Sequence, residues 1–443
     1  MKRQPESGAF VGDHAPRGND REPASRQRLA EMKTGPAQAG PSVARFDPSS
    51  LGDMCRGSVT VLDTIEDIEH YREAIEELAE KTAHPNPFYE PWYFLPLLNV
   101  SQKNRRLCFL LVHGTDDDGS GTPDTLIGFF PFEQKRLHPL CPLSCLCPWR
   151  DTFSWTLRRT PLLRAGAVGN TLAVLGNWLV SRRYAPKILI LDDLPDGSMI
   201  VDAVERWFAG DPRLCHALEI HESHLYRRQS DAETYLARVL SGKRRRHLRR
   251  LRRLLEELGP VRVADVDECE DIDRLIDEFI ALESSQWKGK LGTSMASTPE
   301  GAAIAKSVLK EAYRRNRLSL LTLRVDDRLV AARSAFVAPP GCFGFKMAYD
   351  ESPPYARCGP GFLLDLEGIH RLHDNANLLG AGIEWLDSCA AETAALPLSM
   401  RTEALRLHRY LVAVRGGVVE IVTRRYAQVV KVLPWRMRRL SAF

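Results

Sequence analysis

The chain has 443 residues, enough for two or three domains. Its apolar and charged fractions, 44% and 27%, are ordinary for a globular protein, and a net charge of +4 does not imply a polyanionic partner over the whole surface. We find no run of about twenty apolar residues that could span a membrane, and no secretory signal. The ten scattered cysteines favour reduced thiols. These features predict a cytoplasmic protein without a transmembrane segment.

The first elements in chain order predict a tail followed by a folded domain. Residues 1–48 are rich in Pro, Gly, Arg and Ser, which predicts a disordered tail. A first domain is expected over 58–228. Apolar runs at 106–114 and 125–137 flank a polar turn and predict a hairpin. A strand over 154–163, a helix opened by glycine and a strongly apolar strand over 187–195 then follow.

A long basic helix is predicted next, over 229–258. Eight lysines and arginines lie between Lys243 and Arg253, while leucines keep an apolar stripe along the same helix. Such a face can bind nucleic acid or another polyanion, or contact the phosphates of a coenzyme. It can also be a solvated face between two domains.

A second domain is expected over 259–430, before a basic C-terminal end at 431–443. Apolar runs over 318–325, 329–337 and 342–349 are separated by turns so short that antiparallel neighbours are required. A helix is predicted over 360–374, and a strand over 382–388 follows it.

The start of the helix at Pro360 is the part of the chain best suited to a phosphate. Gly359 and Gly361 bracket Pro360, which is favoured at the first helical position. A helix start presents backbone N–H groups and the positive end of the helix dipole, which favours a bound phosphate. Any connection from a strand to a helix can share this pattern.

The two halves of the chain repeat one order of elements. Each contains a helix, antiparallel strands, a helix opened by glycine and an apolar strand that ends in acidic residues. No repeat of individual residues is visible, so only the order of elements matches. The pattern predicts an α+β (mixed α/β) fold built twice.

Five segments carry a family resemblance. The chain resembles the acetyltransferases of the GNAT superfamily, in particular the CelD-like family linked to cellulose and exopolysaccharide biosynthesis, and is similar to the Fem-type aminoacyl transferases. The resemblance implies tandem acyl-CoA N-acyltransferase (GNAT-like) domains, each a mostly antiparallel sheet flanked by helices. The segments are residues 191–195, 241–253, 282–293, 349–364 and 384–389.

The resemblance also implies an acyl donor. GNAT enzymes hold the pyrophosphate of acetyl-CoA or another acyl-CoA with the loop (Gln/Arg)-x-x-Gly-x-(Gly/Ala), which corresponds here to Arg357, Gly359 and Gly361. The loop is one residue shorter in this chain, and Pro360 removes one N–H donor. The Fem-type branch uses charged transfer RNA instead. Both donors remain open, as does a catalytically degenerate GNAT fold that only binds a ligand.

Direct acyl transfer to an amine requires a base for the acceptor, a donor for the thioester oxygen and an acid for the leaving thiolate. Where strands 342–349 and 382–388 end, Glu384 and Asp387 are the candidate bases and Tyr349 is the candidate acid. Alternatively, Tyr349 is an aromatic at the rim, Glu384 faces solvent and Asp387 caps a turn.

Three further residues are candidates for binding the acceptor, a small molecule or a sugar amine. Trp287 and Lys288 could line its cleft, and Lys346 could bind an anionic group. A tryptophan packed under its own loop and a solvated lysine are the competing interpretations. No metal is expected, because neither the cysteine cluster nor the histidine pairs supply a full set of ligands. The resemblance implies an acyltransferase in exopolysaccharide or cell-envelope metabolism.

Overall fold

The structure is a computed structural model that describes residues 57–101, 105–183, 185–268, 271–373, 382–390 and 403–432. The predicted tail over 1–48 and nearly all of the predicted end over 431–443 lie outside these residues. Within the described ranges, no helix is both long and apolar enough to cross a membrane.

The described strands form one continuous sheet with a symmetrical order. From one edge to the other the order is β1-β2-β3-β4-β6-β13-β7-β12-β11-β10-β9-β8, and β5 pairs with β3. The strands of the first half are β1 (Gly57–Leu62), β2 (Leu107–Gly114), β3 (Leu126–His138), β4 (Cys141–Pro148), β5 (Leu162–Leu163), β6 (Ile188–Pro195) and β7 (Cys215–Arg227). The others are β8 (Val261–Ala264), β9 (Leu318–Val325), β10 (Arg328–Ala338), β11 (Gly341–Tyr349), β12 (Trp385–Asp387) and β13 (Glu403–Ala413).

The pattern of strand pairing is the same when the sheet is followed inward from either edge. Each end contributes four antiparallel strands, β1 to β4 on one side and β8 to β11 on the other. The fourth strand then pairs in parallel with the next one, β4 with β6 and β11 with β12. The predicted hairpins and the mixed α/β fold with two similar halves are therefore confirmed.

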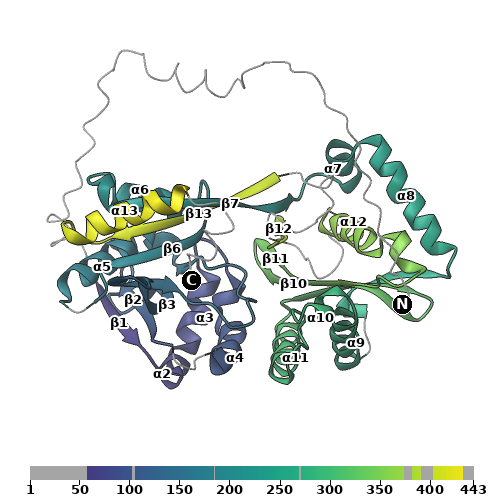
Figure 1. Ribbon diagram of the computed structural model, residues 1–443, viewed down its shortest axis with the longest axis horizontal. Coiled ribbons are helices and arrows are strands. Elements are labelled where there is room, and N and C mark those ends of the chain that lie inside the picture. The colour runs from purple at the N-terminus through teal and green to yellow at the C-terminus, as the bar shows by residue number, and fades with distance from the viewer. Residues whose placement is uncertain are drawn as a thin grey trace, which may run out of the picture. The chain divides into compact units, whose positions relative to one another are not determined.

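The two halves meet at a pair of long strands that they exchange. Strand β13, near the C-terminus, pairs with β6 of the first half through Leu407–Ala413. Strand β7, from the first half, pairs with β12 of the second half through Leu225–Arg227. Strands β7 and β13 also pair with each other along most of their length, and Figure 1 shows yellow β13 running beside teal β6 and β7. Each half thus completes the sheet of the other.

Helices cover both faces of the sheet and close the apolar cores. In the first half they are α2 (Ile65–His70), α3 (Arg72–Glu80), α4 (Pro91–Ser101), α5 (Val168–Ser181) and α6 (Met199–Trp207). The remaining ones are α7 (Ala232–Val239), α8 (Gly242–Glu256), α9 (Ile272–Ser285), α10 (Trp287–Lys290), α11 (Pro299–Arg314), α12 (Pro360–His373) and α13 (Val418–Val432).

One apolar core spans both halves on the face that carries α3, α4, α9 and α11. Helices α5 and α6 cover the opposite face of the first half, and α7, α8 and α12 cover that of the second. Aromatic rings tie the halves together. The ring of Phe336 on β10 lies 5.3 Å from that of Trp92 on α4 and 5.4 Å from that of Tyr93. Such aromatic pairs add to the stability of an already buried interface.

Two predicted elements were wrong. The long helix over 229–258 is two helices, because Leu240 leaves the helical region and the Ser241 hydroxyl accepts the Arg244 N–H at 3.2 Å, which starts α8. The strand over 154–163 is limited to β5. The preceding residues form a loop instead, because the buried Asp151 carboxylate accepts the N–H groups of Phe153 and Trp155.

Candidate active site

The second half contains an opening in the sheet where β11 and β12 separate. The two strands pair over Gly341–Phe343 and Trp385–Asp387. Strand β12 then ends, whereas β11 continues to Tyr349. Among the described residues, no strand pairs with this side of β11 beyond Phe343.

Backbone groups of β11 point into this opening. The Asp350 N–H donates to the Val330 carbonyl at 2.8 Å, so the backbone of Asp350 faces β10. Backbone groups alternate in direction along an antiparallel strand, so those of Met347 and Tyr349 face away from β10. In agreement, the Lys288 ammonium donates to the Met347 carbonyl at 2.7 Å. The N–H groups of Met347 and Tyr349 therefore face the side of β11 that no described strand covers beyond Phe343.

Helix α12 begins beside the same opening. It follows a short 3-10 helix at Tyr355–Cys358, and Gly359 joins the two in a left-handed conformation with a φ of 58°. A side chain at Gly361 would place its Cβ 3.0 Å from the Tyr349 ring, so a larger residue there would have to displace the ring. The predicted donor-binding glycines and the predicted acid Tyr349 thus lie together.

The start of α12 offers positive charge more than free N–H groups. The N–H groups of Phe362 and Leu363 donate to the Gly359 carbonyl. Helix α8 brings the Arg244 guanidinium over the Phe362 ring, 5.6 Å from its centre, and the predicted Arg357 is exposed next to the helix start. These groups suit a phosphate through charge.

Burial is the main cause that raises the pKa of Tyr349, with Glu351 adding to the shift and the neighbouring Trp287 side chain opposing it. Tyr349 therefore carries its proton at neutral pH, as an acid for a leaving thiolate must. The predicted Trp287 is 42% exposed and lies at the rim beside Tyr349.

A cavity of about 660 Å³ lies next to β11. The loop after β4 supplies one wall with Phe153, Ser154 and Trp155, although this loop belongs to the first half. The segment after α9 supplies the other wall, and the predicted Lys288 and Lys346 both line the space. Residues of both halves therefore line this cavity, which lies beside β11 of the second half.

The charges in this cavity are unevenly paired. The Lys288 ammonium lies 3.0 Å from the buried Glu283 carboxylate, which also accepts the Met295 N–H at 2.7 Å. The Lys346 ammonium lies 5.2 Å from the centre of the Trp155 ring and has no ion pair among the described residues. Burial lowers the pKa of Lys346 to about 8.

The structure does not bring the two predicted bases together with Tyr349. Asp387 is fully buried at the end of β12, where it pairs with Arg158 of the first half and accepts the Ser223 hydroxyl. Burial opposes its ionisation, but Arg158 and Ser223 hold the pKa of Asp387 below its ordinary value. Glu384 is exposed before β12 begins, near the start of β11 and not its end.

Sequence reasoning missed the contribution of the first half. Trp155 and Arg158 lie in the loop that was predicted as a strand, and they reach Lys346 and Asp387 of the second half. The signal available was the aspartate Asp151 two residues before Phe153, a spacing typical of an Asx turn. Within the described residues, no group of histidines, cysteines or carboxylates is arranged to hold a metal ion.

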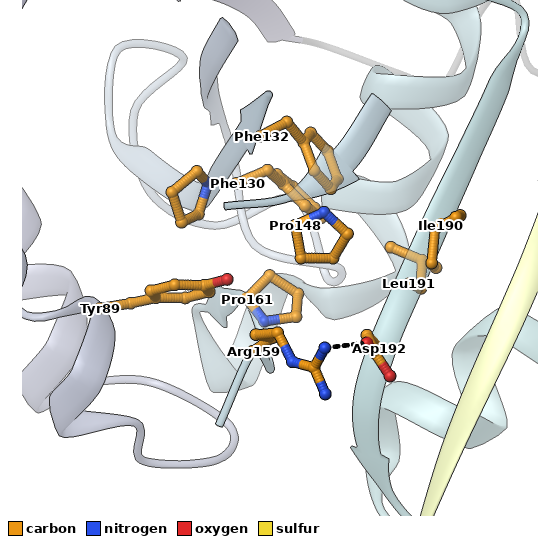
Figure 2. Close-up of a pocket in the computed structure, with 10 residues that line it drawn as sticks. Tyr89, Phe130, Phe132, Pro148, Arg159, Pro161, Ile190, Leu191 and Asp192 are labelled. Atoms are coloured by element: carbon orange, nitrogen blue, oxygen red, sulfur yellow. Dashed lines mark ion pairs between the residues drawn. The ribbon is translucent and has the colours of Figure 1, made fainter. Parts of the chain in front are cut away.

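The corresponding opening in the first half is filled. Strands β4 and β6 pair at Leu146 and Leu189 and then separate. Figure 2 shows Pro148, Pro161 and Tyr89 in the space between them, with Arg159 paired to Asp192 at 2.7 Å. Only about 10 Å³ remains. The space between these residues is therefore closed, and a separate cavity of about 280 Å³, lined by Arg158, Arg159 and Asp193, lies at the end of β6.

The start of α5, the counterpart of the start of α12, already binds an anion of the protein itself. The Asp117 carboxylate accepts the N–H of Gly169 at 3.1 Å and that of Asn170 at 2.7 Å. Asp117 comes from the long loop between β2 and β3. In the second half, β9 and β10 are joined by the short turn at Asp326–Asp327, which is too short to do the same.

Comparisons with known proteins agree with this architecture. Residues 242–393 match the family model described as an acetyltransferase (GNAT) domain. No curated protein matches the sequence significantly. The matched segment contains α8, the cavity lysines, β11, α12 and β12, that is, the open half.

Several solved structures align with most of this chain. FemX is 7% identical, with 81% of this chain and 98% of that chain covered and a TM-score of 0.49. A tandem GNAT protein from the clavulanic acid biosynthesis pathway is 12% identical, with 81% and 100% covered and a TM-score of 0.38. The L-PGS of Bacillus licheniformis is 11% identical, with 82% and 97% covered and a TM-score of 0.42.

The family match and the strand order, not these likenesses, define the fold. The chain has a GNAT-type acyltransferase fold in two linked copies, and the second copy carries the open site.

Proposed function

We propose that the protein transfers an acyl group from acetyl-CoA or another acyl-CoA to an amine, or to a hydroxyl group, and that only its second half performs the reaction. The observation that carries the proposal is the free edge of β11 at Met347 and Tyr349, which borders an open cavity on one side and the start of α12 on the other. The first half has the same elements, but side chains fill the opening between β4 and β6, and Asp117 caps the start of α5.

The residues of the second half divide the chemistry between them. The Met347 N–H donates to the thioester oxygen, which gains negative charge as the acceptor nitrogen attacks the carbonyl carbon. The carbon–sulfur bond then breaks, and the Tyr349 hydroxyl gives its proton to the leaving sulfur. The proton of the acceptor amine leaves to water in the cavity. Arg244 and Arg357 bind the phosphates of the donor near Gly359 and Gly361.

The two predicted bases, Asp387 and Glu384, have different roles in this scheme. Asp387 is held in its ion pair with Arg158, so it positions the end of β12. Glu384 lies on the far side of the paired part of β11 and β12, so a role for it requires the acceptor to reach that end. We further propose that the acceptor belongs to exopolysaccharide or cell-envelope metabolism, as the sequence resemblance implies.

A second candidate function is aminoacyl transfer from charged transfer RNA. The observation in its favour is the outer face of α8, where Lys243, Arg246, Arg249, Arg250 and Arg253 are exposed and have no ion pair within the described residues. A polyanion would bind such a face through its phosphates. A third candidate, a fold that binds a ligand without turnover, is favoured only by the short loop before Gly361.

Calorimetry with acetyl-CoA and the full chain tests the leading proposal. We expect one site per chain. Gly361→Val should weaken binding at least tenfold, because the new side chain collides with the Tyr349 ring. Gly169→Val, at the equivalent place in α5, is the matched control and should leave binding unchanged. Two sites per chain, or no saturable heat with millimolar ligand, would contradict the proposal.

A further inference from the structure

The cavity beside β11 contains a cation without a counter-charge. The Lys346 ammonium lies beside two aromatic rings that contact each other, 5.2 Å from the centre of Trp155 and 5.5 Å from that of Phe345. These rings attract a cation, but they do not neutralise it. Among the described residues, the ammonium forms no hydrogen bond and no ion pair.

The neighbouring acids are engaged elsewhere. The Glu283 carboxylate is used by Lys288 and by the Met295 N–H. The Asp151 carboxylate accepts the N–H groups of Trp155 and Thr156 and so holds the loop of the first half. Lys288 faces the same space, but Glu283 balances its charge. Among the described residues that line the cavity, Lys346 is therefore the cation that no carboxylate pairs with.

A partly buried cation of this kind costs free energy unless something pairs with it. Burial lowers the pKa of Lys346 to about 8, although Glu283 partly offsets the effect and Lys288 reinforces it. The cavity of about 660 Å³ is large enough for a sugar or an amino acid. It is also lined by hydroxyl groups, among them those of Ser294 and Thr298.

We propose that the acceptor carries an anionic group, a carboxylate or a phosphate, and that this group pairs with Lys346 inside the cavity. The inference rests on the proposed function, because it assigns the acceptor side of that site. Lys346 lies next to Met347, whose N–H faces the reacting carbonyl. The anion therefore fixes the acceptor with its nucleophile near the donor. The loop of the first half, through Trp155, sets the shape of the same wall.

Binding can be measured without any donor. Reductive methylation with labelled carbon gives each lysine a methyl resonance, and the one missing in Lys346→Met identifies Lys346. The full chain is titrated with glucosamine, glucosamine 6-phosphate and glucosaminuronate, and separately with inorganic phosphate and acetate. The phosphate and carboxylate arms identify which anion the site prefers.

We expect at least one anionic probe to raise the pKa of Lys346, because the ion pair stabilises the charged form. Glucosamine, which lacks the anionic group, should bind about 10- to 100-fold more weakly than its best anionic relative, and Lys346→Met should remove that preference. Lys306→Met is the matched control, since Lys306 is an exposed lysine of α11 paired with Asp277. It should keep the preference.

Two results would overturn the proposal. One is an unchanged pKa of Lys346 with all four anions up to tens of millimolar. The other is equal binding of glucosamine and its anionic relatives to the unaltered protein. Neither result depends on acetyl-CoA, so the proposed function could fail in calorimetry while the anion site is found, or the reverse.

Discussion

Arg158 and Asp387 lie 229 residues apart in sequence and form a two-pronged ion pair between the two halves. The Arg158 Nε lies 2.8 Å from Oδ2 of Asp387, and Nη2 lies 2.8 Å from Oδ1. Both side chains are buried, at 7% and 0% exposure. A loop of the first half thereby fixes the strand end beside which the site of the second half opens.

Removing one partner should be costly. In Arg158→Met, the Asp387 carboxylate would stay buried without its cation, and we expect the free energy of unfolding to fall by about 3–5 kcal/mol. The double variant Arg158→Met with Asp387→Asn should recover part of that loss. Urea denaturation monitored by circular dichroism measures both effects.

A surface pair provides the comparison. Arg164 pairs with Asp116 at 3.0 Å with both side chains 24% exposed, so Arg164→Met should cost less than about 1 kcal/mol. If Arg158→Met were as mild as this variant, the pair would not hold the two halves together.

Tyr349→Phe tests the acid. The variant keeps the ring against Gly361 but loses the proton for the leaving thiolate, so kcat should fall about 100-fold with little change in KM. Steady-state kinetics of thiol release provide the measurement. Tyr355→Phe is the control, because Tyr355 lies under the Arg328 guanidinium and outside the opening. A kcat within twofold of the unaltered protein would rule out Tyr349 as the acid.

Lys346 should make stability depend on pH in a specific window. Its pKa falls from about 10.5 in the unfolded chain to about 8 in the folded one. Between these values the unfolded chain binds more protons, so stability rises with pH there, and below about pH 8 the full penalty is present. Lys346→Met should thus stabilise the protein at pH 7 by roughly 1–3 kcal/mol.

The stabilisation should shrink as the pH approaches 10, where the folded lysine is already neutral. Thermal unfolding at pH 7, 9 and 10 follows the change, with Lys306→Met as the reference variant. An equal effect of Lys346→Met at all three values would show that the ammonium does not carry the penalty.

Helix α8 offers a test of polyanion binding. Changing Arg246, Arg249 and Arg250 to Glu should abolish a gel shift with transfer RNA, because three exposed cations become anions. In the unaltered protein, binding should weaken steeply with salt, by about 0.7–0.9 in the logarithmic slope for each phosphate contacted. Arg274→Glu, on α9, serves as the control. A shift that survives the triple change would place any polyanion elsewhere.

Much of the fold could be predicted because it depends on local patterns. The alternation from Phe343 to Tyr349 and the short turns around it define β10 and β11, and Pro360 marks the first residue of α12. The sequence could predict that Gly361 lies near Tyr349, because a single short connection joins the end of β11 to the start of α12.

The rest depends on contacts between distant parts of the chain. Nothing near Asp387 in sequence indicates Arg158, so a strand-end aspartate could not be distinguished from a free base. Likewise, Lys346 acquires its unusual surroundings from Trp155, a residue of the other half. Asp117 had no visible role until the structure placed it at the start of α5.

The exchange of β7 and β13 between the halves affects how the protein can fold during its synthesis. Strand β6 can pair with Leu407–Ala413 only after all the other described strands have been synthesised. The first half therefore cannot finish its sheet while it is being synthesised, in contrast to tandem domains that fold one after the other. A chain stopped before residue 403 would expose the unpaired edge of β6, a surface prone to aggregation.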